Sequence, residues 1–355
     1  MDLKKYFRNA NIFGLLISVA AFSLFTAFSL QDIQVPAGGD SRQTTGWPLG
    51  PQTEEEAAKK TMPSAAVGNS VLLNNDILAF YGHPISKNMG ILGRYPREEL
   101  TQKLSDLAAE YKEASGGRNI KKAFYIIYAT AQGKPWRIDP ATKDLPKDQQ
   151  KKIFEDFKSP SQSVLTIDQI DKTLLPAWIE FAQANDMLIF LDHQIGLLDP
   201  VESIKTMFKY LQYPNVHLAL DPEWRTAKPM QEFGSVSADE INAAQEAMQK
   251  YLIENNMEGE RMLVIHQFRD VMIKNRKNVR SDFEYVRLVH CMDGVGTPAE
   301  KLGTYKFNAQ ATNMPIKAFK LFYDFKLPGV LVDSPLLTPK DVYALEPRPY
   351  IIMYQ

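Results

Sequence analysis

NVHLALDPEW, residues 215–224, begins with a short apolar run, His217–Leu220, and ends in a polar cluster, Asp221-Pro222-Glu223-Trp224. The apolar run lacks polar alternation, which is typical of a strand that is buried on both faces, as in a parallel sheet. Reactive groups of parallel barrels lie at the carboxyl ends of the strands, which is where this polar cluster falls. The stretch therefore predicts a buried parallel strand that leads directly into a candidate site.

Seven other runs share this character and are separated by longer amphipathic segments. Eight buried strands that alternate with helices predict an α/β fold, and their number favours closure into a (β/α)8 TIM-type barrel over residues 71–355. A doubly wound open sheet is the competing interpretation. The seven runs are Ile77–Tyr81, Ala123–Tyr128, Met187–Leu191, Met262–His266, Tyr285–His290, Ala318–Tyr323 and Tyr350–Tyr354.

Helices are predicted between these strands where apolar residues recur at helical spacing. The clearest start is at Ser237, because Glu240 follows three residues later and the two form a capping-box pattern. The predicted helices are Arg97–Glu113, Asp168–Asn185, Val201–Leu211, Ala238–Ile253 and a short helix from Thr338-Pro339.

The first 70 residues differ from the barrel segment. Lys4, Lys5 and Arg8 precede an uncharged apolar run, Ile12–Leu30, so residues 1–30 are predicted to be a signal peptide or an uncleaved membrane anchor. Residues 31–70 are rich in proline, glycine and polar residues, which predicts a disordered linker. The barrel is therefore expected outside the cytoplasm, secreted or anchored to the cell membrane.

Composition narrows the classes of partner. The chain has 41 Lys and Arg against 42 Asp and Glu, a net charge of −1, so no basic face for nucleic acid is expected. Cys291 is the single cysteine, which excludes an internal disulfide and any CxxC metal site. No dinucleotide, P-loop or nucleophile-elbow motif occurs, and no cofactor is expected.

Polar and aromatic residues gather at the predicted carboxyl ends of the strands, whereas the amino-terminal ends hold less distinctive residues. Because these ends meet at one mouth of a parallel barrel, the set predicts a binding site for a polar ligand, with a carbohydrate preferred. The residues expected to bind substrate are Tyr81, His83, His193, Trp224, His266, Gln267, Asp293, Tyr323 and Tyr354.

Asp221 and Glu223 form the sharpest candidate for chemistry. Residues two apart on an extended strand point to the same side, so both carboxyls are expected to face the barrel mouth. Two close carboxyls cannot ionise independently, and the raised pKa of one suits a proton donor for glycoside hydrolysis. Glu223 is predicted to be the general acid, with Asp221 and Asp192 tuning it or stabilising positive charge. The alternative is that Asp221 only caps the next helix and Trp224 packs on the barrel rim.

The Leu220-Asp221-Pro222-Glu223 segment resembles the LDxE strand end of the lysozyme-like family 25 glycoside hydrolases, which are barrels that cut peptidoglycan. The resemblance implies a cell-envelope glycan as substrate. This chain has Tyr81-Gly82-His83 where that family has an aspartate, and Ala219 where chitinase-like family 18 barrels have one. The ALDPEW strand and the export signal also look like those of uncharacterised secreted bacterial barrel proteins labelled as lipoproteins, although the lipid-attachment cysteine is missing.

Two other classes of function stay open. His83, His193, His266 and His290 could join an aspartate in a metal-dependent phosphodiesterase or hydrolase, although no HxH pair or HExxH helix assigns a metal ligand set. The barrel could also bind glycan without cleaving it, with the excursion over residues 132–160 and its Trp136 as a lid or as a solvated insertion.

Overall fold

The computed structural model describes residues 70–133, 165–229, 232–326 and 330–355. The predicted signal or anchor segment, the predicted linker, and Trp136 with most of its excursion lie outside these residues. Among the described residues, no helix combines the length and the apolar character needed to cross a membrane.

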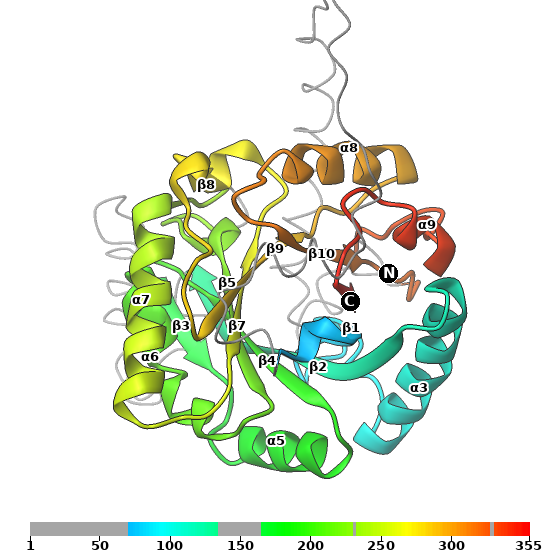
Figure 1. The fold of residues 1–355 in the computed structure, drawn as a ribbon, viewed down its shortest axis with the longest axis horizontal. Helices are drawn as coiled ribbons and strands as arrows, with labels where there is room; N and C mark the ends of the chain where they lie inside the picture. The colour runs from blue at the N-terminus through cyan, green and yellow to red at the C-terminus, as the bar shows by residue number, and fades with distance from the viewer. Residues whose placement is uncertain (1–69, 134–164, 230–231, 327–329) are drawn as a thin grey trace, which may run out of the picture.

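Eight parallel strands form a closed barrel (Figure 1). Closure is shown by β1, whose Ile77 pairs with Lys121 on one side and with Ile351 on the other. Each predicted strand coincides with one of the eight, so the predicted barrel is confirmed and the open doubly wound sheet is wrong. Around the barrel the strands are β1 (Asn75–Gly82), β2 (Asn119–Gly133), β4 (Leu188–Gln194), β5 (Val216–Asp221), β7 (Arg261–His266), β9 (Val286–Met292), β10 (Ile316–Leu321) and β11 (Ile351–Tyr354).

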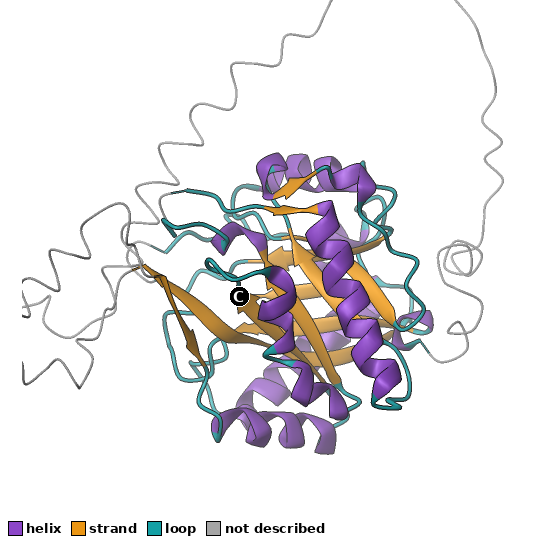
Figure 2. Ribbon diagram, turned by 90° about the vertical axis from the view of Figure 1, so that its left-hand side faces the viewer, coloured by secondary structure: helices purple, strands orange, loops and turns teal. Residues whose placement is uncertain are grey.

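Helices pack around the outside of the strands (Figures 1 and 2). The capping box predicted at Ser237 and Glu240 is present, and Thr297 with Glu300 forms another. The helices are α3 (Arg97–Ala114), α5 (Leu174–Ala184), α6 (Pro200–Lys205), α7 (Ala238–Glu254), α8 (Pro298–Ala309) and α9 (Pro339–Tyr343).

Two predicted helices were too long. Asp168 lies in β3 (Leu165–Gln169), which pairs antiparallel with the extended end of β2, so α5 begins only at Leu174. The helix predicted over Val201–Leu211 is α6 followed by a separate 3-10 helix, Phe208–Gln212. In both cases apolar residues recur at helical spacing, but part of the segment forms other backbone hydrogen bonds, those of a strand in the first case and of a 3-10 helix in the second.

Two connections also differ from the expected strand–helix alternation. Helix α8 was not predicted, because its segment PAEKLGTYKFNA has few apolar residues at helical spacing. Between β7 and β9 the chain forms two 3-10 turns and β8 (Ile273–Lys274), which pairs with β6 (Val236–Ser237).

Alternation along each strand separates an inner apolar layer from an outer one. On β4, Leu188 and Phe190 pack inside the barrel, whereas Ile189 and Leu191 pack against the helices. This alternation determines which polar residue at each strand end faces the barrel interior.

The amino-terminal end of the barrel holds buried ion pairs, so the expectation of undistinguished residues there was wrong. Asp76 accepts from Arg118 at 3.2 Å and from Arg348 at 2.6 Å, and Arg287 lies 2.6 Å from Glu260. These charges join strands to the flanking segments as ion pairs, which is a structural role.

Candidate functional site

A layer of polar side chains closes the carboxyl end of the barrel interior. It consists of Tyr81, Tyr125, Asp192, Asp221, His266, Asp293 and Lys320, which we call the polar layer. Each member is at most 6% exposed. Four of the seven carry carboxylate or imidazole groups, so the layer concentrates titratable groups in a region that excludes water.

Hydrogen bonds connect the layer across the barrel. The Tyr81 hydroxyl donates to Oδ2 of Asp192 over 2.8 Å. The same Oδ2 lies 3.8 Å from Nε2 of His266, and the Tyr125 hydroxyl lies 2.8 Å from that nitrogen. On the other side of the ring, Nδ1 of His266 lies 3.0 Å from Oδ2 of Asp293. One imidazole is thus held between two aspartates that come from different strands.

These contacts decide the charge of the imidazole. Burial by itself would lower the pKa of His266, but the negative charges of Asp192 and Asp293 outweigh it and raise the pKa above its usual value. Burial would likewise raise the pKa of Asp293, yet His266 and Lys320 lower it. The pair is therefore an imidazolium beside an aspartate anion.

Asp221 and Glu223 have the opposite tendency. Burial, with the nearby Asp293 and Asp192, raises the pKa of Asp221 to about 7. The Glu223 carboxyl, which is desolvated and close to Asp221 and Asp293, has its pKa raised well above its usual value. Asp221 thus raises the pKa of Glu223 as expected, but the prediction that both residues lie on one extended strand was wrong, because β5 ends at Asp221 and Glu223 lies in the 3-10 helix Pro222–Trp224.

Asp221 also fulfils the alternative that the sequence left open. Its side chain accepts from the backbone N–H of Glu223 at 3.2 Å and caps the short 3-10 helix Pro222–Trp224. Glu223 and Trp224 follow in that helix and are only partly buried. Glu223 thus lies at the mouth, by which we mean the strand carboxyl ends and the loops that follow them, and its carboxyl is close to Asp221 and Asp293.

Sequence reasoning missed Tyr125 and Lys320. Both lie within apolar runs, so the sequence does not mark either as a site residue. Strand alternation is the signal that could have shown that they face the barrel interior. Lys320 Nζ lies 3.6 Å from the centroid of the Tyr81 ring, a cation–π contact. It also lowers the pKa of Asp221 and of Glu223, so the layer contains two cations beside its carboxyls.

Two carboxylate oxygens of the polar layer find no hydrogen-bond partner within the described parts of the chain. Oδ1 of Asp192 and Oδ1 of Asp293 are buried and unpaired. A buried acceptor without a donor costs about 1–3 kcal/mol, so such an atom needs an explanation. Both oxygens offer an acceptor to a ligand hydroxyl or to water within the barrel.

The loops at the mouth are shaped by close backbone contacts. Gly82 has a φ of +154°, and a Cβ there would lie 2.5 Å from the carbonyl oxygen of Met89, so the loop after β1 folds back on the strand end. After β9, the carbonyl of Gly294 accepts from Lys301, which also pairs with Asp333 at 2.9 Å. The segment after β9 is therefore held in place by α8.

Four predicted binding residues lie away from the polar layer. His193 is on the outward face of β4, where Nδ1 contacts the carbonyl of Gln194, and Gln267 contacts the outward-facing His290 at 2.8 Å. The Tyr354 hydroxyl pairs with that of Tyr111 on α3, and Tyr323 stacks beside Tyr354. Because neighbouring residues of a strand point to opposite faces, a strand-end position alone did not place these side chains inside.

His83 lies on the loop after β1, where Nδ1 accepts from the backbone of Ile85. Of the four histidines in the metal alternative, His266 alone belongs to the polar layer. Within the described parts of the chain, no group of three or more His, Cys, Asp or Glu residues is placed to hold a metal ion.

Fold and site together define a closed parallel α/β barrel with a buried acid–base layer beneath its mouth. No model of a known protein family matches the chain, and a search of curated proteins likewise finds no match.

Proposed function

We propose that this protein is a glycoside-hydrolase-like barrel that acts outside the cytoplasm and cleaves a glycosidic bond, with Glu223 as the general acid. The supporting observation is the carboxyl of Glu223, a half-buried residue directly after β5, whose pKa is raised by burial and by Asp221. A glycosidase needs a carboxyl that is still protonated when the substrate is bound.

In this proposal Glu223 donates its proton to the glycosidic oxygen as the bond to the anomeric carbon breaks. Asp221, once ionised, stabilises the positive charge that develops on the sugar ring. Water supplies the hydroxyl that ends on the anomeric carbon, and its remaining proton returns to the carboxyl pair. Proton transfer of this kind contributes about 10²–10⁴-fold in rate.

In this proposal Asp192 acts indirectly, from the polar layer beneath the mouth. It is fully buried and hydrogen-bonded to Tyr81, so it does not reach the substrate as an attacking group. Its contacts with Tyr81 and His266 instead set the electrostatic environment of the carboxyl pair. The N-terminal apolar segment supports the extracytoplasmic location, and a cell-envelope glycan is the substrate we favour.

The test is hydrolysis by the full chain of peptidoglycan and a panel of polysaccharides, with release of reducing ends measured with and without EDTA. We expect release that survives EDTA and falls about 10²–10⁴-fold in Glu223→Gln. Glu246→Gln, an exposed residue of α7, is the matched control and should retain full activity.

Full activity in Glu223→Gln would eliminate the acid assignment. Loss of activity with EDTA, restored by a divalent metal, would favour the metal-dependent hydrolase. Retention of a glycan without any cleavage would assign a binding barrel instead.

A further inference from the structure

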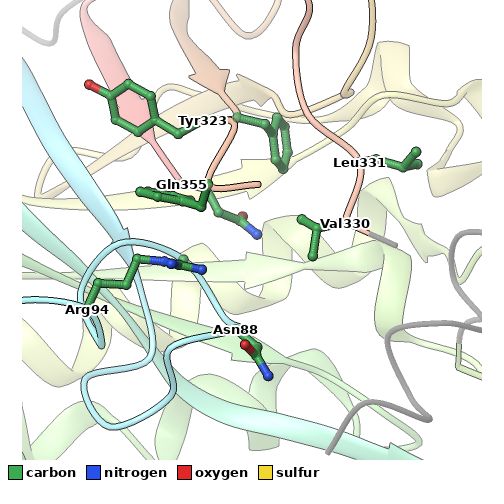
Figure 3. A pocket seen from close by; sticks show the side chains of 9 residues that line it. Asn88, Arg94, Tyr323, Val330, Leu331 and Gln355 are labelled. Carbon is green, nitrogen blue, oxygen red and sulfur yellow. The ribbon is translucent and has the colours of Figure 1, made fainter. Parts of the chain in front are cut away.

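A pocket lies at the mouth (Figure 3), and Glu223 is not among its lining residues. It is a small depression that is partly open to solvent. The loops after β1, β10 and β11 contribute its walls, so it belongs to the same end of the barrel as the polar layer. The lining residues used below are Asn88, Arg94, Tyr323, Phe325 and Gln355.

Arg94 is the charged side chain among the residues that line this pocket. Its guanidinium stacks 3.9 Å from the centroid of the Phe325 ring, which holds the planar group in place. Nε of Arg94 is buried and has no hydrogen-bond partner among the described residues. Among the residues that the structure describes, no Asp or Glu forms an ion pair with Arg94.

The neighbours of Arg94 complete a polar cradle. Asn88 and Gln355 bring side-chain amides to the same pocket, and Figure 3 shows Arg94 and Gln355 directed toward the same space. Burial lowers the pKa of Arg94, and no carboxylate among the described residues raises it in return. An anion bound here would provide that offset.

We propose that this pocket is a subsite for a carboxylate-bearing sugar unit, in which Arg94 forms a bidentate ion pair with the carboxylate and the Asn88 and Gln355 amides bind its hydroxyls. A guanidinium matches the planar geometry of a carboxylate through two parallel N–H···O bonds. The Tyr323 ring adds an apolar wall of the kind on which sugar rings pack.

The position of the pocket fits an extended ligand. In the ring of strands, β5 and β11 are separated by three strands in either direction, so Glu223 and Gln355 follow opposite sides of the barrel. A glycan that reaches both must cross the mouth. The acidic unit would therefore be a different sugar from the one whose glycosidic bond is cleaved. The inference rests on the proposed function only in joining the pocket and Glu223 through one glycan.

Binding to the full chain carrying Glu223→Gln tests the subsite without turnover. The probes are oligogalacturonate, whose carboxylate belongs to a uronic acid, and short peptidoglycan glycan strands, whose carboxylate belongs to a lactyl group. Each is compared with its carboxyl-reduced form by titration calorimetry. We expect at least one acidic probe to bind about tenfold or more tightly than its reduced form.

Adding Arg94→Gln should remove this preference. Arg94→Lys should keep part of it, because lysine retains the positive charge but lacks the bidentate guanidinium donors. Lys87→Gln, an exposed residue of the same loop, removes an equal charge and should leave the preference unchanged. Thermal unfolding of each variant checks that the barrel is intact.

Equal binding of acidic and reduced probes, or a preference that persists in folded Arg94→Gln, would overturn the subsite. These outcomes are separable from the proposed reaction. Carboxylate-selective binding through Arg94 without any hydrolysis would retain the subsite and reject the hydrolase, whereas hydrolysis with no dependence on Arg94 or on the carboxylate would do the reverse.

Discussion

His266 and Asp293 face each other over 3.0 Å between Nδ1 and Oδ2, and both are buried inside the barrel. Asp192 lies on the other side of the same imidazole. The positive charge of His266 lowers the pKa of Asp221, whereas the negative charges of Asp293 and Asp192 raise it. The order in which the carboxyls of the mouth lose their protons therefore depends on a residue that does not face the solvent.

Asp221 should make the protein less stable as pH rises. Its pKa is raised from 3.8 to about 7, so the folded state holds its proton more tightly than the unfolded state does. The free energy of unfolding contributed by this group is fully present below pH 3.8 and is lost as pH rises through about 7. The loss amounts to about 4 kcal/mol at 1.36 kcal/mol for each pKa unit.

The measurement is denaturant unfolding of Asp221→Asn and the wild type at pH 4 and pH 8. We expect the variant to gain stability over the wild type by up to about 4 kcal/mol at pH 8, and by far less at pH 4. Asp106→Asn, an exposed position on α3, should show no such pH-dependent difference. A difference of the same size at both pH values would contradict the raised pKa.

Tyr81→Phe removes the hydroxyl that donates to Asp192 and leaves a buried carboxylate oxygen without its donor. We expect a loss of about 1–3 kcal/mol in unfolding free energy. We also expect an altered pH profile of hydrolysis, because Asp192 contributes to the electrostatic environment of Asp221.

Tyr111→Phe is the matched control for that variant. It removes a buried hydroxyl that pairs with Tyr354 at 2.7 Å in the outer layer, away from the acidic groups. Stability should fall by a similar amount while the pH profile stays in place. Identical pH profiles for Tyr81→Phe and the wild type would show that the Tyr81 contact is structural only.

Lys320→Met removes a cation that lowers the pKa values of both Asp221 and Glu223. In the wild type, hydrolysis should rise with pH through about 7 as Asp221 ionises. Without Lys320 this rise should move to higher pH, and the rate at pH 7 should fall on the order of tenfold. The pH dependence of kcat measures both effects.

Lys317→Met is the control on the same strand. Lys317 faces outward, where burial lowers its pKa to about 7 and its ammonium donates to the carbonyls of Asn308 and Ala311. We expect lower stability and an unmoved pH profile. If both lysine variants shift the profile equally, the effect of Lys320 is not local to the mouth.

Much of the barrel could be predicted because a strand that is buried on both faces has an uninterrupted apolar sequence. Runs such as Ile77–Tyr81 and Met262–His266 are apolar without alternation, and all eight such runs are strands. The errors arose where a local pattern has two solutions. Asp168 continued a helical spacing but pairs with β2, because a neighbouring strand offers hydrogen bonds that the sequence does not display.

The candidate site was likewise predicted in part, because the sequence places residues at strand ends but does not show which face of the strand they occupy. Asp192 and His193 are adjacent and were both expected at the mouth, yet only Asp192 joins the polar layer, since strand alternation turns His193 outward. Lys320 was missed for the converse reason: its inward direction is visible only once the strand register is known.

The sequence by itself determined the eight strands, the order of strand and helix, and the polar character of the strand ends. These properties follow from burial and local spacing, which each segment carries alone. Only the tertiary structure decided that His266 lies between Asp192 and Asp293, and that Arg94 contacts Phe325. Such contacts join residues far apart in the chain, and their existence depends on barrel closure and strand register, which no single segment encodes.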